Sequence, residues 1–318
     1  MEYRHTPVLL AEVLQHLSPH PGSIIVDCTL GGAGHSDRIA ECIAPTGLLV
    51  GIDQDDAALI AAADTLRLGQ QTLLVKGNFA DLDRLLTEAN VPYVDGFLFD
   101  LGVSSPQLDV VERGFSYHGD APLDMRMDPS AGGITAADVV NSYQESDLAR
   151  VIREYGEERW ASRIAAFVVA ARARRPVSTT SELVDIIKAA VPAGARREGP
   201  HPARRTFQAL RIEVNHELDV LDTALRAAVR WLVPGGRIVV LSYHSLEDRI
   251  TKTVLAAGAT DRTPPGLPVP LPEQAAYLRL LTRGAEVPSE QEQHDNPRSA
   301  SARLRAAERV RPSTGERR

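Results

Sequence analysis

Cysteine is scarce in this chain of 318 residues, where Cys28 and Cys42 are the only two. Two thiols are too few for a disulfide framework or for a zinc site built on thiolates. The scarcity excludes the small disulfide-bonded class of secreted protein and favours a reducing, cytoplasmic setting. Cys28 lies in a glycine-rich segment, where we expect it to pack rather than to react.

Long hydrophobic runs are also missing. The longest, residues 164–171, lies between Arg163 and Arg172 and is far too short to cross a bilayer. The first ten residues, MEYRHTPVLL, lack the apolar core and the cleavage pattern of a signal peptide. We therefore expect a soluble protein that has no membrane partner.

The chain also lacks an overall positive charge, since its formal net charge is −7. This average argues against a polyanionic partner, but it conceals an uneven distribution. Residues 1–100 carry 14 acidic and 5 basic side chains, whereas residues 159–211 carry 3 acidic and 11 basic ones. Such asymmetry indicates that one part of the chain meets a negatively charged partner.

Several short apolar runs are continuous rather than alternating, as in strands that are buried on both faces of a parallel sheet. These runs are residues 24–26, 48–52, 73–75, 97–99 and 238–241. Segments of helix length lie between the first four runs, at residues 36–43, 56–66 and 82–89. This alternation of strands and helices predicts a doubly wound α/β sheet.

The alternation stops between the fourth and fifth runs, and an insertion is the simplest explanation. Trp160, Ile164 and Val168 recur at helical spacing, and Thr179 with Glu182 forms a capping box before residues 183–191. The insert is therefore predicted to be helical. We expect residues 109–212 to form this insert, and residues 1–108 and 213–318 to form the two parts of the sheet domain.

The return to the sheet is predicted to be one long amphipathic helix. Apolar residues recur at steps of four and three from Leu210 to Leu232, and the Pro-Gly-Gly sequence at 234–236 ends the pattern. Five prolines between 264 and 272 predict an extended surface loop after the fifth strand. Residues 277–282 and 302–310 are predicted to complete the sheet.

A glycine-rich turn follows the first predicted strand. Glycines there let the backbone approach a ligand closely, and the next helix offers unpaired N–H groups at its N-terminus. A nicotinamide dinucleotide is the less favoured ligand. After Gly32 and Gly34 the third glycine of its motif would fall on Asp37, and that carboxylate would repel a pyrophosphate.

The residues around the turn fit S-adenosylmethionine better. The pattern for this cofactor needs an acid at the first strand end, here Asp27, and an acid at the second strand end, here Asp53, to accept the ribose hydroxyls. Asn78 and Phe79 follow the third strand, where they can hold an adenine, and Asp100 ends the fourth. Together these features predict an S-adenosylmethionine-dependent methyltransferase.

Longer blocks of sequence are more specific than these general features. They are HTPVLL at residues 5–10, DLGVSSPQLD at 100–109, RGFS at 113–116, PLDMRMD at 122–128, GEER at 156–159, RTFQALR at 205–211, SYHSLEDR at 242–249 and NPRS at 296–299. With these blocks, nearly the whole chain resembles the bacterial MraW (RsmH) family.

The resemblance implies a class I methyltransferase domain interrupted by a helical insert. It implies methylation of the N4 amine of cytidine 1402, in the decoding region of 16S ribosomal RNA within the small ribosomal subunit, with S-adenosylmethionine as the donor. The cofactor contacts that the family pattern implies are Ala33, Gly34, His35, Asp53, Phe79, Asp100 and Gln107.

Two features depart from the pattern of many methyltransferases. Thr29 stands where a glycine is common, and the sequence Asp-Leu-Gly-Val at 100–103 replaces the Asp-Pro-Pro-Tyr element of many amino-methyltransferases. The familiar aromatic clamp on the target base is therefore missing at this position. The residues that hold the base stay open at this point.

Asp100 is the first candidate for the catalytic residue. The lone pair of a cytosine N4 amine is delocalised into the ring, so the site needs an acceptor for its N–H and a methyl group in line. A carboxylate at the fourth strand end meets the first need. The alternatives in neighbouring loops are Ser104, Ser105, His118 and His244. Asp124 and Asp128 are interpreted as ion-pair partners of Arg113 or Arg126 rather than as metal ligands, and no metal is expected.

Five arginines are expected to contact RNA: Arg159, Arg163, Arg174, Arg204 and Arg205. The first three are placed on one helical stripe, and the other two in a loop at residues 193–206 that follows phosphates. Because a duplex hides N4, the target base should be unpaired or flipped out. Two alternatives stay open: methylation of DNA or a small molecule, and a non-catalytic, cofactor-sensing RNA-binding protein that acts in ribosome assembly.

Overall fold

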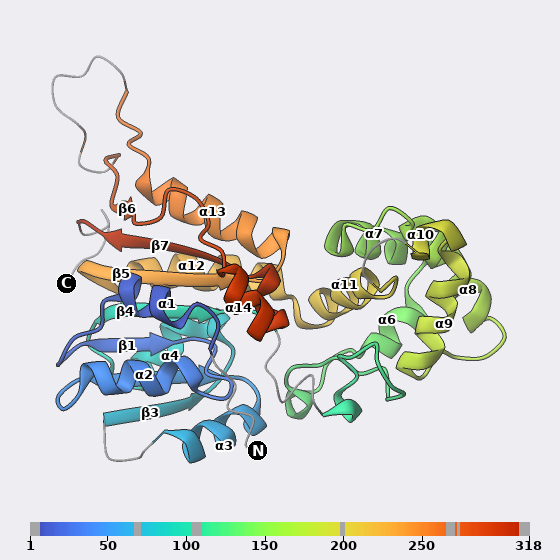
Figure 1. Cartoon of the computed structure of the whole chain (residues 1–318), viewed down its shortest axis with the longest axis horizontal. Helices are drawn as coiled ribbons and strands as arrows, with labels where there is room; N and C mark the ends of the chain where they lie inside the picture. Colours follow the sequence, from blue (N-terminus) through green and yellow to red (C-terminus); the bar gives the residue numbers. More distant parts are fainter. Residues whose placement is uncertain are drawn as a thin grey trace. The chain divides into compact units, whose positions relative to one another are not determined.

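The computed structural model describes residues 7–66, 71–102, 110–197, 201–264, 271 and 274–311. The chain divides into two compact units. The first combines Met1–Gly102 with Leu218–Arg318, and the second is Val103–Glu217. The second unit is thus an insertion in the sequence of the first (Figure 1).

A seven-stranded sheet organises the first unit, in the order β3-β2-β1-β4-β5-β7-β6. The strands are β1 (Ile24–Asp27), β2 (Leu48–Asp53), β3 (Gln71–Lys76), β4 (Val94–Asp100), β5 (Leu232–Ser242), β6 (Leu278–Leu280) and β7 (Arg303–Arg309). The first five are parallel, whereas β7 runs antiparallel to both β5 and β6. This order, with an antiparallel strand inserted beside β5, is the class I methyltransferase fold and confirms the predicted fold class.

Helices cover both faces of this sheet, as Figure 1 shows. The helices of the unit are α1 (Leu10–Leu17), α2 (Gly34–Ile43), α3 (Asp56–Thr65), α4 (Leu82–Glu88), α12 (Glu217–Trp231), α13 (Ser245–Ala259) and α14 (Glu290–Asp295), with short 3₁₀ helices η1 (Phe79–Asp81) and η4 (Pro297–Ser301). Val26 and Val50 face the core shared with α4, α12 and α13. Ile25 and Leu49 face the other core, shared with α1, α2 and α3. Burial on both faces explains why these strands are continuously apolar.

The second unit is helical, as predicted. Its helices are α6 (Ala136–Ser142), α7 (Glu145–Gly156), α8 (Ala161–Arg172), α9 (Thr180–Ala190), α10 (Ala193–Arg197) and α11 (Arg204–Asn215), with 3₁₀ helices η2 (Val111–Arg113) and η3 (Pro129–Ala131). The predicted capping box at the start of α9 is confirmed: Thr179 accepts from the Glu182 N–H, and Glu182 accepts from the Thr179 N–H. Met125 and Met127 pack in the core of this unit.

The single long helix predicted from Leu210 to Leu232 is wrong. The helix is interrupted at His216, which has a left-handed φ of 51°, so that α11 ends at Asn215 and α12 begins at Glu217. The apolar spacing continues across the break because its two halves bury in different cores: Leu210 packs in the second unit, and Leu225 packs in the first. Leu232 already belongs to β5.

Two other expectations about local structure are also corrected. The segment at residues 193–206 is not all loop, because α10 and the first turn of α11 lie in it. Arg159 and Arg174 flank α8 instead of sharing a helical stripe with Arg163, because α8 covers only Ala161–Arg172. Among the described residues, no helix is both long enough and apolar enough to span a bilayer.

Candidate active site

The predicted site residues of the first unit lie at the carboxyl ends of neighbouring parallel strands. Asp27 ends β1, Asp53 ends β2 and Asp100 ends β4, while Tyr243 directly follows β5. In open α/β sheets, this edge is where ligands bind. The strand order therefore brings together residues that are far apart in the sequence.

The glycine-rich turn after β1 has a backbone that other residue types adopt only with strain. Gly31 and Ala33 both have positive φ, and a Cβ on Gly32 would meet no heavy atom within 4 Å. Gly34 starts α2, and a Cβ there would come within 2.8 Å of Pro7. The turn is thus open at Gly32 and closely packed at Gly34, and a ligand can approach its backbone.

Asp27 holds the glycine-rich turn in place through hydrogen bonds. Its buried carboxylate accepts the Ser36 hydroxyl at 2.7 Å and the Thr29 N–H at 3.0 Å. Burial raises the pKa of Asp27, although these two hydrogen bonds act in the opposite direction. Because both donors belong to the turn or to the first turn of α2, Asp27 fixes the glycine loop and does not face a ligand itself.

Thr29 joins two strand ends. Its hydroxyl oxygen accepts the Asp100 N–H at 2.6 Å, and its own N–H binds Asp27. A glycine at this position could not make the first contact. The departure from the common pattern thus fixes the backbone of Asp100 relative to the glycine loop.

Asp53 keeps acceptor capacity in a half-buried position. One carboxylate oxygen accepts the Gly31 N–H and the other accepts the Asp55 N–H, both at 2.9 Å. A carboxylate has about four lone-pair positions, so two remain for further donors. Burial raises the pKa of Asp53 to about 6, despite the two backbone hydrogen bonds.

Phe79 and Asn78 follow β3 but differ in how they are held. The Phe79 ring forms a T-shaped pair with the Phe99 ring, with centroids 5.9 Å apart, and remains half-buried. The Asn78 amide is engaged locally: its oxygen accepts the Ala80 N–H, and its nitrogen donates to Gln54. Phe79 therefore offers a partly exposed apolar ring after β3, whereas the Asn78 side chain orders the backbone that follows the strand.

Asp100 is held by side chains from two other elements. The Tyr243 hydroxyl donates to its Oδ1 at 2.7 Å, and His35 Nδ1 lies 3.4 Å from its Oδ2. The other ring nitrogen of His35 lies 2.9 Å from the Val8 carbonyl, which can only accept. Burial lowers the pKa of His35, but the hydrogen bond and charge of Asp100, the charge of Asp27 and the Val8 carbonyl together raise that pKa above its ordinary value.

Tyr243 is the residue at this edge that the sequence analysis missed. Its ring lies against Gly102, where an added Cβ would approach the ring to 3.3 Å, and Gly102 has a positive φ of 101°. Burial and the negative charge of Asp100 raise the pKa of Tyr243 well above its ordinary value, so the hydroxyl stays a donor. The block at 242–249 contained this residue, but only the pairing of β4 with β5 shows its link to Asp100.

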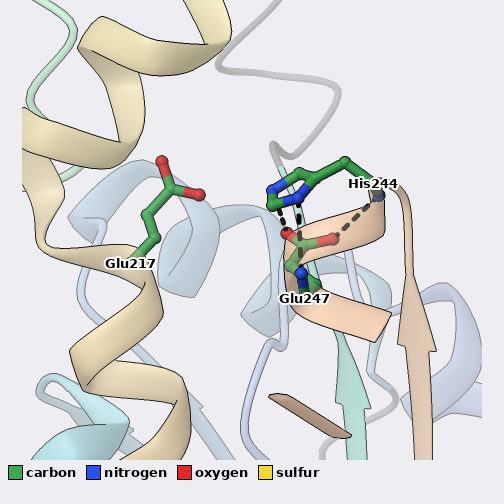
Figure 2. Close-up of side chains that lie close together, drawn as sticks. All are labelled: Glu217, His244 and Glu247. Carbon is green, nitrogen blue, oxygen red and sulfur yellow. Dashed lines mark hydrogen bonds and ion pairs between the residues drawn. The ribbon is translucent and has the colours of Figure 1, made fainter. Parts of the chain in front are cut away.

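His244, one of the alternatives to Asp100, serves the start of α13. Its ring accepts the Glu247 N–H at 3.4 Å, and Glu247 in turn accepts the backbone N–H groups of Tyr243 and His244. The other ring nitrogen lies 3.1 Å from the Glu247 carboxylate (Figure 2). His244 is therefore a helix-capping residue.

The other predicted residues have different outcomes. Gln107, Ser104 and Ser105 lie outside the described residues. His118 is an exposed residue of the second unit, beside Tyr117. Of the acids in the block at 122–128, Asp124 forms the predicted ion pair with Arg126, whose two nitrogens lie 2.9 and 2.6 Å from it.

The five arginines predicted to contact RNA are all exposed. Arg159 lies over the Trp160 ring and Arg163 over the Phe167 ring, at 5.2 and 5.4 Å from the ring centroids. Arg205 donates to the Glu157 carbonyl at the end of α7, so it also supports the fold. Other arginines of the basic segment are paired within the unit, as Arg211 is with Glu217.

Comparison with known proteins identifies close relatives. The model of the MraW methylase family matches residues 2–310. A protein of Thermobifida fusca named ribosomal RNA small subunit methyltransferase H is 57% identical over 96% of this chain and 94% of its own length. A protein of the same name from Geotalea daltonii is 54% identical over 97% of this chain and 99% of its own length. A solved rRNA methylase from Streptococcus thermophilus covers 95% of this chain and 92% of its own, with 12% identity and a TM-score of 0.42.

Proposed function

The chain belongs to the MraW methylase family, and from this premise we propose that it methylates the N4 amine of cytidine 1402 in 16S ribosomal RNA. S-adenosylmethionine is the cofactor. The relatives named ribosomal RNA small subunit methyltransferase H support the RNA substrate. The observation that carries the proposal is the position of Asp100, whose carboxylate is clamped between Tyr243 and His35 at the edge of the sheet.

The described residues fit this cofactor. The open backbone at Gly32 and the start of α2 suit its charged amino-acid part, with Ala33, Gly34 and His35 contributing backbone groups. Asp53 has two lone-pair positions left for the two ribose hydroxyls, and Phe79 offers a ring face to the adenine. Gln107 is proposed as a further contact from the family pattern. The His35 side chain is already engaged with Asp100 and Val8, so we assign it to positioning.

The main task of the chain's own residues is to orient the cytosine amine for attack. When it is bound, S-adenosylmethionine supplies a methyl group on a positively charged sulfur. Asp100 would accept one N–H of the cytosine amine, which localises the nitrogen lone pair and orients it for attack. Tyr243 and His35 donate to different oxygens of Asp100, so each oxygen retains a lone pair for the amine. The proton lost on methylation would be taken up by Asp100 or passed to water.

RNA contacts are assigned to the second unit. Arg159, Arg163, Arg174 and Arg204 are exposed, and so is the arginine at 205 that also caps α7. Their positive charge favours a phosphate backbone. A base must be unpaired for its N4 to enter a site at the edge of a sheet, so the proposed substrate segment is single-stranded or locally opened.

Mass mapping of ribosomal RNA tests this function. Small subunits from cells that lack the protein would be incubated with S-adenosylmethionine and either the wild-type chain or Asp100→Asn. We expect one new methyl group on N4 of cytidine 1402 with the wild type, and transfer that is slower by about a hundredfold with Asp100→Asn.

Two outcomes contradict the proposal. Methylation of free DNA or of a small molecule, but not of the subunit, indicates a different substrate class. Unchanged rRNA methylation in cells that carry both Asp100→Ala and Asp53→Ala indicates a non-catalytic, cofactor-sensing assembly protein.

A further inference from the structure

A stack of aromatic rings lies in the second unit. The Tyr117 and His201 rings are nearly parallel, with an interplanar angle of 6° and centroids 4.7 Å apart. The exposed His118 ring lies beside both, at 4.5 Å from Tyr117 and 5.8 Å from His201. We call Tyr117, His118 and His201 the ring cluster.

The ring cluster is anchored to the core and is not a loose surface group. The Tyr117 ring forms a T-shaped pair with the ring of Phe207, which is 3% exposed, at a centroid distance of 5.9 Å and an angle of 86°. His201 Nδ1 lies 3.3 Å from the Ala203 N–H and accepts from it, so the proton of the neutral ring is on Nε2. Tyr117 and His201 are thus fixed in orientation while both remain half-buried at the surface.

The electrostatic setting favours a neutral His201 ring in basic surroundings. Burial, then the positive charge of Lys188 and the neighbouring His118, lower the pKa of His201. Lys188 lies in α9, and Arg204 begins α11 three residues after His201. A flat, uncharged ring with cationic side chains nearby suits the combination of a nucleobase and its phosphate.

We propose that the ring cluster is a stacking platform for an unpaired base of the RNA substrate, outside the methylated nucleotide. The inference rests on the proposed RNA substrate and assigns residues that hold the strand rather than the reacting base. Stacking explains why the rings are presented at the surface, because every base has a π face and no base-specific hydrogen bond is required. Duplex RNA, whose bases are already stacked and paired, should not use this platform.

Binding of short RNA tests the platform directly. The affinity of the full chain for a fluorescently labelled, unstructured RNA of about twelve nucleotides would be measured for the wild type, His201→Ala and His201→Phe. We expect His201→Ala to bind about tenfold more weakly, within the range known for loss of one stacked base. His201→Phe, which keeps a ring face but no N–H, should restore most of the affinity. The matched control is His294→Ala, at an exposed histidine of α14, which should change nothing.

The salt dependence separates stacking from charge. Loss of a stacking contact should lower the affinity at every salt concentration without changing the slope of log K against log salt, whereas loss of a phosphate contact reduces the slope. Wild-type affinity in His201→Ala overturns the inference, and so does an equal loss in His201→Ala and His201→Phe. Circular dichroism and S-adenosylmethionine affinity must match the wild type, and His118→Ala, at an exposed residue, gives a second variant if His201→Ala does not fold.

These measurements do not depend on the outcome for the proposed function. If mass mapping finds no cytidine N4 product while His201→Ala still loses RNA affinity, the function fails and the platform stands. If the N4 product forms and His201→Ala leaves both RNA affinity and the KM for the small subunit unchanged, the platform alone fails.

Discussion

Several residues at the carboxyl edge of the sheet form more than one hydrogen bond. Substitutions that remove a single hydrogen bond can therefore test the role of each partner. The Asp100 carboxylate accepts a hydrogen bond from the Tyr243 hydroxyl and lies beside His35, while the Asp100 backbone N–H donates to the Thr29 hydroxyl. Two side chains thus fix the carboxylate, and a third fixes the backbone of the same residue. A group that must hold an amine in line needs such support, because a small error in position is costly in rate.

Tyr243→Phe should lower kcat without weakening the cofactor complex. The change removes one hydrogen bond to a charged group, worth about 1.5–3 kcal/mol, and leaves the ring against Gly102. If that bond orients Asp100, kcat falls about 10-fold to 100-fold, while the affinity for S-adenosylmethionine changes less than about threefold. Single-turnover methylation and calorimetry check the two quantities. Tyr93→Phe, at an exposed tyrosine, is the control. A wild-type kcat for Tyr243→Phe would remove Tyr243 from the mechanism.

Cofactor affinity should depend on pH through Asp53. Its pKa is raised to about 6 by burial, and only the ionised carboxylate can accept both ribose hydroxyls while it also accepts two backbone N–H groups. Affinity for S-adenosylmethionine should therefore rise with pH and be about tenfold weaker at pH 5 than at pH 7. Calorimetry between pH 5 and 8 measures this profile. Asp53→Asn should bind weakly at every pH, and a pH profile that persists in this variant would assign the titration to another group.

The same raised pKa has a consequence for stability. The folded chain binds the Asp53 proton more tightly than the unfolded chain does, because the ordinary pKa is 3.8. The contribution of this group to the free energy of unfolding is therefore greatest below pH 4, decreases as the pH rises to about 6, and is constant above that. At neutral pH the buried, ionised Asp53 carboxylate therefore lowers the free energy of unfolding, but it can accept hydrogen bonds from the ribose hydroxyls.

Residue types and spacing were enough to predict that Asp53 and Asp100 end parallel strands, because strand ends are readable from the apolar runs. They were not enough for Tyr243, since its partner is 143 residues away in the sequence and only the pairing of β4 with β5 brings them together. His244 illustrates the opposite case. Its position after a strand left capping and catalysis equally open, and the contacts with Glu247 show the capping role.

At the scale of elements, local signals predicted the starts of helices better than the continuity of helices. The capping box of Thr179 and Glu182 is a local device and was read correctly. The break at His216 was missed because the apolar spacing runs through it. Asn215 shows why the chain turns there: its side chain accepts the Met127 N–H and donates to the Met125 carbonyl, contacts that no periodicity reveals.

Arg309 joins β7 to the end of α12, and its loss should destabilise the first unit. The side chain is 1% exposed, and its Nη1 lies 2.6–2.7 Å from the carbonyls of Val229, Arg230 and Leu232. Arg309→Met leaves these acceptors buried without this donor, and we expect the free energy of unfolding to fall by about 1–3 kcal/mol or more.

Urea unfolding measures this change, and the exposed Arg311→Met serves as the control with the same substitution. The S-adenosylmethionine affinity of the protein that remains folded should be unchanged, since Arg309 lies away from the carboxyl ends of the parallel strands. Equal stability of Arg309→Met and Arg311→Met would show that the buried arginine contributes nothing.

At the scale of the whole molecule, the basic character is regional. The second unit carries 15 basic and 16 acidic side chains, so its excess of arginine at residues 159–211 is balanced elsewhere in the same unit. Several of these arginines are also paired, such as Arg175 with Glu182 and Arg211 with Glu217. The sequence count alone therefore overstated the charge that is available to RNA, and the relevant set is smaller.

That smaller set leads to a prediction about salt dependence. Arg159, Arg163, Arg174 and Arg204 are exposed, whereas Arg205 is excluded from the test because it caps α7. Replacing the four by Gln should weaken binding to the RNA and reduce the slope of log K against log salt by up to about 0.7 per lost contact with a single strand. Fluorescence anisotropy at salt concentrations from roughly 50 to 300 mM measures both the affinity and the slope.

A control with the same change in net charge decides whether contact or general charge is responsible. Arg38, Arg84, Arg226 and Arg279 are exposed arginines of the first unit, each paired with a nearby acid. Their replacement by Gln makes the whole molecule equally more acidic, but it removes no proposed RNA contact. If the two quadruple variants reduce the slope equally, the second unit does not bind the phosphates, and RNA affinity depends only on the net charge of the molecule. If only the first variant does so, the strand lies along the second unit, where the ring cluster would meet its bases.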